Sequence, residues 1–307
     1  MTAPARTGPR CRILVLRALG LGDLLAAVPA LRALRRTYPA ARLTVAAPRG
    51  LAPLVELVGG VDELVDTAPL APLDPSLSGA DLAVNLHGRG PQSNALLRAV
   101  RPARLVAYGA GSTWRDDEHE VLRWCRLLDE AGIPADPADL DLAVPPDPPL
   151  CRGAVLVHPG SAAASRRWPV GRWAEVVRGL PGRVLVTAGP GEEPRAHEVA
   201  ALGGLGRDAV VSGLSLHRLA ALVAASRLLL ASDTGVAHLA TAVRTPSVVL
   251  FGPVGPDQWG PPTDRPWHVA LWGGVRSANA GPGPAPGLLA LTPGAVLGAA
   301  LRQLATY

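Results

Sequence analysis

Lysine is absent from this chain of 307 residues, and all 30 of its basic residues are arginine. A cation that binds phosphate here must therefore present a planar guanidinium fork instead of an ammonium point charge. Aromatic residues make up only 4% of the chain, and no basic run with interleaved stacking residues occurs. We therefore expect no nucleic-acid partner, although a formal net charge of +5 leaves open a weak peripheral contact with anionic lipid headgroups.

Cysteines and long apolar runs are also scarce. The three cysteines, Cys11, Cys125 and Cys151, are far apart and form no C-x-x-C pair, which favours free thiols in a reducing compartment. No run approaches the ~18 apolar residues of a membrane-spanning helix. Arg17 and Asp23 interrupt the first apolar run before it reaches the length of a signal peptide. We expect a cytoplasmic protein, free or peripheral to the inner face of the membrane.

What the sequence does contain is apolar runs that alternate with helical patterns. This alternation predicts an α/β protein with a parallel sheet in each half. The length favours two domains, and the proline-rich stretch 134–150 is typical of a linker. The predicted strands are 12–17, 43–47, 62–65, 81–86, 104–107, 154–157, 184–187, 228–231 and 247–251, and the main predicted helices are 23–37, 50–58, 91–99, 116–131, 170–179, 193–202, 215–225, a helix after Asp233 that ends near 242, and 293–304.

Two tight turns, one in each half, each open a predicted helix: Gly20-Leu21-Gly22-Asp23 and Ser232-Asp233-Thr234-Gly235. A strand, a tight turn and a helix N-terminus present an anion site or a carboxylate at the carboxyl edge of a parallel sheet. One such unit in each half predicts two facing nucleotide-binding folds, as in a glycosyltransferase.

Asp23 has two interpretations. A carboxylate at this position is often only the N-cap of a helix. It is also suited to act as a general base, since a helix N-terminus keeps it ionised until it takes the proton of an acceptor hydroxyl.

The second turn offers backbone N–H groups at Thr234, Gly235 and Val236 that are suited to a diphosphate. Asp233 would repel a phosphate and better suits sugar hydroxyls. His238, one turn further on, is interpreted equally well as a core or capping histidine and as a ligand contact.

A third cluster runs from Ser161 to Trp168. Arg166 and Arg167 follow a strand and a His-Pro-Gly turn, where they either form a solvated turn or neutralise a phosphate leaving group. Glu192 and Glu193 follow the next strand, where doubly wound folds often place an acid that binds ribose; a solvated helix start is the alternative.

Weaker candidates complete the set. His87 and Arg89 follow a predicted strand and are plausible substrate contacts without a motif. Asp139 and Asp141 have D-x-D spacing, but they lie in the proline-rich linker, so we expect no metal site. The first turn lacks the third glycine of G-x-G-x-x-G and has a carboxylate where a pyrophosphate would lie, which disfavours a dehydrogenase.

Taken together, these residues resemble glycosyltransferase family nine, the ADP-heptose heptosyltransferases. The matching elements, in the family's order, are Arg17 to Asp23, His158-Pro159-Gly160-Ser161, Arg166-Arg167-Trp168-Pro169, Ser232-Asp233-Thr234-Gly235 with His238, and Phe251-Gly252-Pro253. The resemblance implies a GT-B fold with two facing Rossmann-like domains. It places an acceptor-side domain at 1–145, a nucleotide-sugar-binding domain at 146–290, and a C-terminal helix at 291–307 that crosses back to the N-terminal domain.

The resemblance also implies roles for single residues. Asp23 matches the catalytic base, and Arg166 stands where relatives usually have a lysine near the donor phosphates. Further donor contacts are implied for the phosphate side at Ser161, Thr234 and Gly235, and for the sugar and nucleoside at Asp233, His238 and Glu193. Beside the resemblance, we expect donor contacts at Val236 and Gly189, and acceptor-side contacts at Gly22, His87 and Arg89.

These matches predict an inverting, metal-independent glycosyltransferase without a cofactor. It would move a heptose from an ADP-sugar to a hydroxyl of a glycan, glycolipid or small metabolite. Two other classes stay open: a sugar-nucleotide epimerase of the same fold, and a catalytically silent nucleotide-sugar-binding protein.

Overall fold

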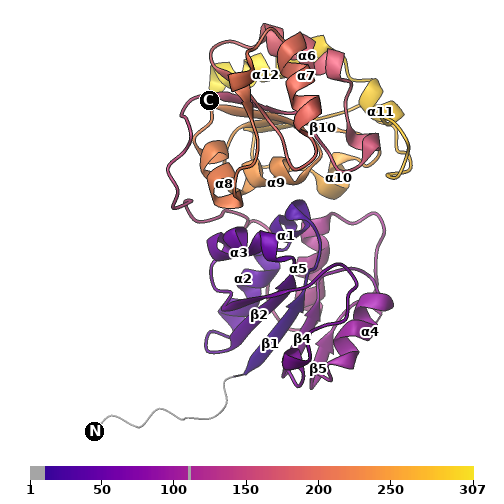
Figure 1. The fold of residues 1–307 in the computed structure, drawn as a ribbon. Coiled ribbons are helices and arrows are strands. Elements are labelled where there is room, and N and C mark those ends of the chain that lie inside the picture. The colour runs from indigo at the N-terminus through magenta and orange to yellow at the C-terminus, as the bar shows by residue number, and fades with distance from the viewer. Residues whose placement is uncertain (1–10, 110–111) are drawn as a thin grey trace. The chain divides into compact units, whose positions relative to one another are not determined.

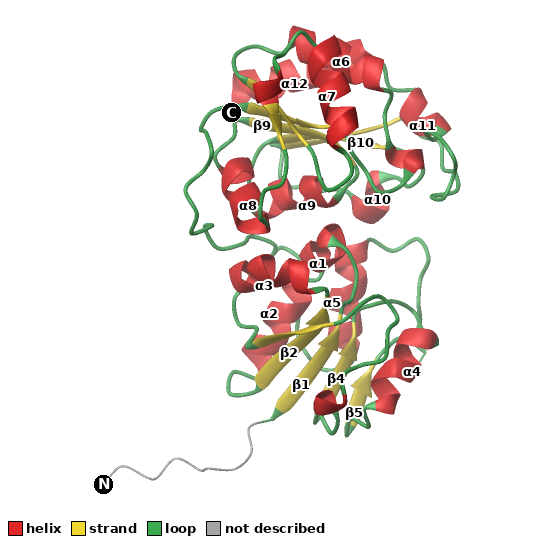
Figure 2. Ribbon diagram, viewed as in Figure 1, coloured by secondary structure: helices red, strands yellow, loops and turns green. Residues whose placement is uncertain are grey.

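The structure is a computed structural model that describes residues 11–109 and 112–307. These residues form two compact units, each built around one parallel sheet (Figures 1 and 2). The first unit runs to Gly20 and continues with Ala27–Asp116 and Arg123–Pro137. The second unit contains Ala138–Tyr307 and also takes Leu21–Ala26 and Asp117–Leu122 from the N-terminal half. The division therefore differs from a single boundary at residue 145.

The first unit contains a five-stranded parallel sheet in the order β3-β2-β1-β4-β5. Because β1 and β4 are buried along almost their whole length, they appear in the sequence as continuous apolar runs. The strands are β1 (Arg12–Leu16), β2 (Arg42–Ala47), β3 (Glu63–Asp66), β4 (Leu82–Asn85) and β5 (Arg104–Val106); the helices of the N-terminal half are α1 (Leu21–Ala26), α2 (Val28–Thr37), η1 (Arg49–Leu51), α3 (Ala52–Val58), η2 (Pro75–Leu77), α4 (Gln92–Ala99) and α5 (Glu120–Glu130).

The second unit contains a six-stranded parallel sheet in the order β11-β10-β9-β6-β7-β8. Its strands are β6 (Val155–His158), β7 (Val184–Thr187), β8 (Val210–Val211), β9 (Leu228–Ser232), β10 (Ser247–Phe251) and β11 (His268–Trp272), and its other elements are η3 (Ala164–Arg166), α6 (Val170–Gly179), α7 (Glu193–Leu202), η4 (Arg207–Ala209), α8 (Leu216–Ala224), α9 (Gly235–Ala242), α10 (Pro256–Trp259), α11 (Pro286–Leu289) and α12 (Pro293–Thr306). Within this unit α6, α7 and α12 cover one face of the sheet, and α8, α9 and α10 the other (Figure 1).

The helix predicted over 23–37 is two helices, α1 and α2, separated at Ala27. Pro29 lies in the first turn of α2. Proline lacks an N–H group, and its ring clashes with the carbonyl four residues earlier, so a helix cannot run through it undisturbed. The chain leaves the second unit at this break and re-enters the first.

Strands β8 and β11 were not predicted. β8 is only two residues long, and β11 is an edge strand, His268–Trp272, with half-buried residues and polar or aromatic ends. The apolar stretch of β11, Val269 to Trp272, lies beside a Gly/Pro-rich segment, and β8 is too short to give a pattern. By contrast, α6 over 170–179, α7 over 193–202 and β7 over 184–187 are confirmed with the predicted bounds.

The C-terminal helix packs on the second sheet. Val296, Ala299 and Ala300 of α12 are buried in the same apolar core as Trp168 and Trp173. Those two indole rings meet edge to face, with their centroids 5.1 Å apart. The apolar face of α12 is therefore buried within the second unit.

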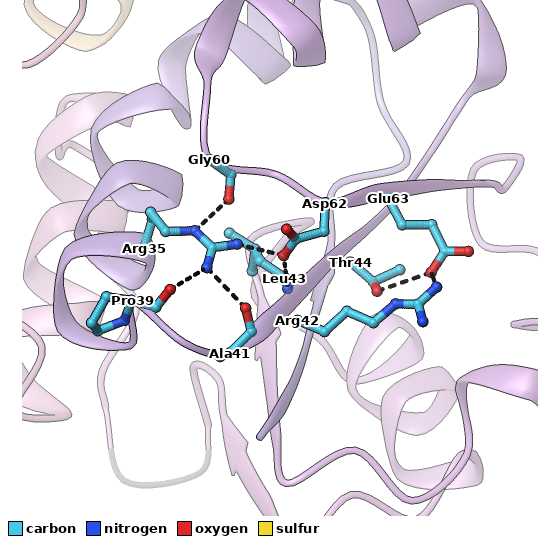
Figure 3. A network of polar contacts seen from close by, with 9 residues as sticks. All are labelled: Arg35, Pro39, Ala41, Arg42, Leu43, Thr44, Gly60, Asp62 and Glu63. Atoms are coloured by element: carbon cyan, nitrogen blue, oxygen red, sulfur yellow. Dashed lines mark hydrogen bonds and ion pairs between the residues drawn. The ribbon is translucent and has the colours of Figure 1, made fainter. Parts of the chain in front are cut away.

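A polar network closes one end of the first sheet (Figure 3). Arg35, in the last turn of α2, donates to the carbonyls of Gly60 at 2.7 Å and Ala41 at 2.8 Å, and it pairs with the Asp62 carboxylate. Asp62 also accepts a bond from the Leu43 amide at 2.7 Å. One guanidinium thus joins α2 to the turns that precede β2 and β3, which is a structural role.

His268 provides a test of the second sheet. It is 8% exposed on β11, its Nδ1 lies 2.9 Å from Ser247 Oγ, and burial lowers its pKa to about 4, aided by the charge of Arg265. The unfolded chain, with an ordinary pKa near ~6.5, binds this proton more readily, so stability is complete above that pH and falls as the pH drops towards 4. We expect His268→Asn to reduce the acid-induced loss of unfolding free energy by on the order of 2–3 kcal/mol.

Urea unfolding from pH 7 to pH 4 measures this difference. The matched control is His197→Asn, because His197 is exposed on α7. Identical pH dependence in wild type and His268→Asn would contradict the expectation.

Candidate functional site

Each sheet has one switch point, where successive strands proceed in opposite directions and open α/β folds bind ligands. It lies between β1 and β4 in the first unit and between β6 and β9 in the second. Four of the turns selected from the sequence follow these four strands; the Gly189 turn follows β7, and Phe251-Gly252-Pro253 lies at the end of β10. The topology thus places the candidate residues at ligand-binding edges.

The turn after β9 surrounds Asp233 with cationic and polar groups. Asp233 is buried, and Arg166 Nη1 donates to its backbone carbonyl at 3.2 Å and lies 3.6 Å from its Oδ2. His238 Nε2 lies 3.8 Å from the other carboxylate oxygen, Oδ1. Thr234 caps α9, its Oγ1 accepting from the Val236 amide at 3.4 Å. The predicted donor-site residues of this turn are therefore brought together with Arg166.

Burial opposes charge at this cluster. Burial raises the pKa of Asp233, while His238 and Arg166 act in the opposite direction and the charge of Asp23 adds to the rise. Burial likewise lowers the pKa of His238, although the nearby Asp233 and Asp23 carboxylates favour its protonated form. His238 is accordingly a neutral imidazole at neutral pH.

The segment that carries Asp23 packs on α9 within the second unit. A Cβ atom added to Gly22 would lie 2.7 Å from His238 Cδ2, and one added to Gly235 would lie 2.7 Å from Leu21 Cβ. The charge of Asp23 acts on both Asp233 and His238. Asp23 is therefore in electrostatic contact with the turn after β9.

The turn after β6 separates the roles of the two arginines. Arg167 Nε donates to the Ser161 carbonyl at 2.7 Å, and its Nη2 to the Ala162 carbonyl at 3.2 Å, so Arg167 holds the turn. Arg166 instead points to Asp233. The Ser161 side-chain oxygen is buried and has no hydrogen-bond partner among the described residues. A buried hydroxyl without a partner costs about 1–3 kcal/mol, which a bound ligand oxygen would offset.

Glu192, not Glu193, joins the turns after β6 and β7. Its Oε2 accepts from the Gly189 amide at 2.9 Å and lies 3.3 Å from His158 Nε2. His158 Nδ1 lies 3.0 Å from Thr187 Oγ1. Glu192 and Thr187 therefore contact the two ring nitrogens of His158. Burial lowers the pKa of His158, so the ring stays neutral.

His87 and Arg89 belong to the first unit, in the loop after β4. The Asn85 side chain supports this loop: its Oδ1 accepts from the His87 amide at 2.9 Å, and its Nδ2 donates to the Gly88 carbonyl at 3.3 Å and to Ser93 Oγ at 2.9 Å. Arg89 is exposed, with Nη1 4.0 Å from Asp116 Oδ1. A buried amide thus fixes the backbone while the basic side chain remains accessible.

The linker carboxylates are not arranged for a metal. Asp141 Oδ1 pairs with Arg265 at 2.6 Å, and its Oδ2 with Arg244 at 3.2 Å. In the part of the chain that the structure describes, no group of three or more His, Cys, Asp or Glu is placed to hold a metal ion.

Sequence reasoning missed three contributors: His158 and Glu192 as a linked pair, and Trp259. The Trp259 ring meets the His238 ring edge to face, with centroids 5.8 Å apart. His-Pro-Gly after a strand and the Glu-Glu pair were visible signals for the first two. Trp259 lies on α10, a helix of only four residues that was not predicted. No sequence pattern pointed to its contact with His238.

Two open parallel sheets with glycine turns at their switch points match the GT-B fold of solved heptosyltransferases. Residues 113–274 match the model of glycosyltransferase family 9 (heptosyltransferase), and the chain belongs to that family. The predicted fold class, the enzyme class and the family resemblance are thereby confirmed.

One curated relative and one solved structure match over most of the chain, and a second relative matches over a third of it. Lipopolysaccharide heptosyltransferase 1 of Salmonella typhimurium is 23% identical over 287 residues, which are 80% of this chain and 89% of that protein. The Pseudomonas aeruginosa protein of the same name is 37% identical over 107 residues, 33% of this chain and 29% of the relative. The solved Escherichia coli ADP-heptose lps heptosyltransferase II has a TM-score of 0.76 and 20% identity, covering 96% of this chain and 98% of that one.

Among the residues that the structure describes, none of the helices combines the length and apolarity needed to cross a membrane.

A substitution at Gly160 tests whether the Glu192 carboxylate fills the space beside this glycine. A Cβ atom at Gly160 would overlap the Glu192 carboxylate, which Gly189 and His158 hold in place. We expect Gly160→Ala to lower the unfolding free energy by about 1–3 kcal/mol, the usual cost of overpacking.

Urea denaturation in two backgrounds measures this cost. It should largely disappear in Glu192→Ala, where the obstructing carboxylate is gone, and Gly171→Ala is a matched control with no atom within 4 Å of the new Cβ. The same cost in both backgrounds would show that Glu192 is not what Gly160 accommodates.

Proposed function

We propose that this glycosyltransferase moves a heptose from ADP-heptose to a hydroxyl group of a glycan, glycolipid or small molecule, with inversion and without a metal ion. The observation that carries the proposal is that one unit holds the Asp23 carboxylate, the Arg166 guanidinium and the N-terminus of α9 together. The names of the relatives support the donor and the sugar: heptosyltransferases in several bacteria, one of them solved with ADP-2-deoxy-2-fluoro heptose.

The donor diphosphate is assigned to the turn after β9 and the neighbouring turn after β6. The first N–H groups of a helix lack intrahelical acceptors and favour an anion. At α9 the Val236 amide is already capped by Thr234, so the Gly235 amide is the better phosphate donor of the two. The Ser161 hydroxyl and Arg166 complete this side, and Asp233 with His238 is assigned to the sugar.

The ribose contact that we expected of Glu193 fits Glu192 better. The Gly189 amide donates to Oε2 of Glu192, and His158 Nε2 lies 3.3 Å from the same oxygen. They orient the carboxylate before any ligand arrives, which reduces the cost of ordering it on binding.

The chemistry is a single displacement at the anomeric carbon. Asp23 takes the proton of the acceptor hydroxyl, the acceptor oxygen bonds to the anomeric carbon, and the bond to the diphosphate oxygen breaks with its electron pair. Arg166 and the α9 amides stabilise the charge that develops on the leaving ADP. The mechanism requires a product of inverted anomeric configuration and activity that persists in excess EDTA.

The acceptor side is assigned to the first unit, where the loop after β4 presents His87 and Arg89. A glycolipid acceptor would bring the enzyme to a membrane surface, and the formal net charge of +5 favours anionic headgroups there. Lipopolysaccharide is the acceptor class that the relatives' names suggest.

Asp23→Asn tests the base. The amide keeps the size of the carboxylate but cannot take a proton, so we expect kcat to fall at least ~10²-fold with the Kd for ADP nearly unchanged. ADP release from ADP-heptose, with and without candidate acceptors, measures turnover.

Asp264→Asn is the control, since Asp264 is exposed in the same unit. Near-normal turnover by Asp23→Asn would remove Asp23 from the mechanism. A changed sugar configuration without any acceptor would instead identify an epimerase, and absence of turnover in wild type with all acceptors would favour a silent binding protein.

Calorimetric titration with ADP, UDP, GDP and ADP-heptose tests the donor. We expect selective ADP binding, tightened by the heptose, and a Kd for ADP raised ~10–100-fold in Arg166→Ala, because one charge-assisted contact is lost. Arg218→Ala, at an exposed position, is the control. Selectivity for UDP or GDP would replace the donor, and unchanged ADP affinity in Arg166→Ala would contradict the phosphate role of Arg166.

A further inference from the structure

Gly22 needs to be glycine for space and not for backbone freedom. Its φ lies outside the left-handed region that favours glycine, unlike that of Gly59 or Gly90. A Cβ atom at Gly22 would instead lie 2.7 Å from His238 Cδ2, 3.4 Å from His238 Nε2 and 3.5 Å from Gly235 Cα. The imidazole ring therefore occupies the volume that any other residue would fill.

The contact is reciprocal. A Cβ atom at Gly235 would lie 2.7, 2.8 and 2.9 Å from Cβ, Cγ and Cδ2 of Leu21. Thus α1 and α9 approach each other through a glycine on each side, with Leu21 seated on Gly235 and His238 seated on Gly22. Because α1 groups with the second unit, this approach lies within one unit.

The His238 ring has little freedom to move away. Its Nε2 lies 3.8 Å from Asp233 Oδ1, and its ring meets that of Trp259 edge to face with centroids 5.8 Å apart. A carbon at 2.7 Å is about 1 Å inside an ordinary van der Waals contact. A side chain at Gly22 would therefore displace α1, and with it the adjacent Asp23.

We propose that Gly22 is a positioning residue: by leaving room for the His238 ring, it sets Asp23 beside the N-terminal turn of α9. This inference rests on the proposed role of Asp23 as base. It assigns Gly22 a role in packing, which is different from the acceptor contact expected from the sequence. Positioning within about 1 Å of the productive geometry is worth as much as 10²-fold in rate.

Gly22→Ala tests the proposal through rate and affinity together. We expect kcat to fall ~10–100-fold while the Kd for ADP, measured by calorimetry, stays within about twofold, because Arg166 and the α9 amides remain in place. Gly294→Ala, with no atom within 4 Å of the new Cβ, is the matched control and should leave both unchanged. An unchanged kcat, or a loss of ADP affinity that parallels the loss of kcat, overturns the proposal.

Thermal unfolding in two backgrounds tests the contact without relying on activity. Gly22→Ala should lower the Tm by roughly 3–8 °C in the wild type and by much less in His238→Ala, where the ring is absent. If Gly22→Ala alone does not fold, recovery of folding in the double variant supports the contact, and failure to recover overturns it. An equal loss of Tm in both backgrounds also overturns it.

The two proposals fail differently. If Asp23→Asn loses its rate while Gly22→Ala does not, only the positioning inference is rejected. If Asp23→Asn retains its rate, Asp23 is not the base and the positioning inference loses its premise. The proposed function itself is rejected only if the wild type transfers no sugar from ADP-heptose to any acceptor.

Discussion

The close approach of α1 and α9 is the constraint on which the candidate site depends. The N-terminal turns of these helices follow different strands, β1 and β9, and meet with a glycine on each side. This approach lets the Asp23 carboxylate act on Asp233 and His238. Everything charged in the cluster is partly or fully desolvated, so the groups respond strongly to one another. Because Gly22 and Gly235 have no side chains, the two helices approach closely enough for the charge of Asp23 to act on Asp233 and His238.

A second polar cluster lies at the turns after β6 and β7 of the same sheet. Glu192 accepts from a backbone amide and lies beside His158, whose other ring nitrogen contacts Thr187. These hydrogen bonds and contacts are largely buried, and buried polar networks rigidify a site more than exposed contacts do. The second unit thus has one cluster suited to phosphate and sugar and another suited to hydroxyls, each supported by a glycine that permits close packing.

The sequence predicted the fold well where the signal was local. Central strands such as β9 and β10 are continuous apolar runs, and most candidate residues follow strands at switch points. The sequence did not predict features that depend on contacts between distant parts of the chain. Pro29 marked the break between α1 and α2, but nothing local shows that α1 joins the second unit. Glu192 and Glu193 are neighbours with identical side chains, so only the register of α7 separates the oriented carboxylate from its neighbour.

Because α1 belongs to the second unit, the enzyme cannot be cut into two independent halves at the linker. The second unit is not a continuous stretch of chain: six residues, Leu21–Ala26, are embedded in the N-terminal half although they pack with the C-terminal half. A fragment that begins at Ala138 would leave Gly235 and His238 uncovered and would lack Asp23. Exchange of halves between related enzymes at the proline-rich linker would likewise pair α1 of one parent with α9 of another. The unit of recombination is therefore the C-terminal half together with two six-residue segments upstream, Leu21–Ala26 and Asp117–Leu122, and all three must be complementary for any chimera to work.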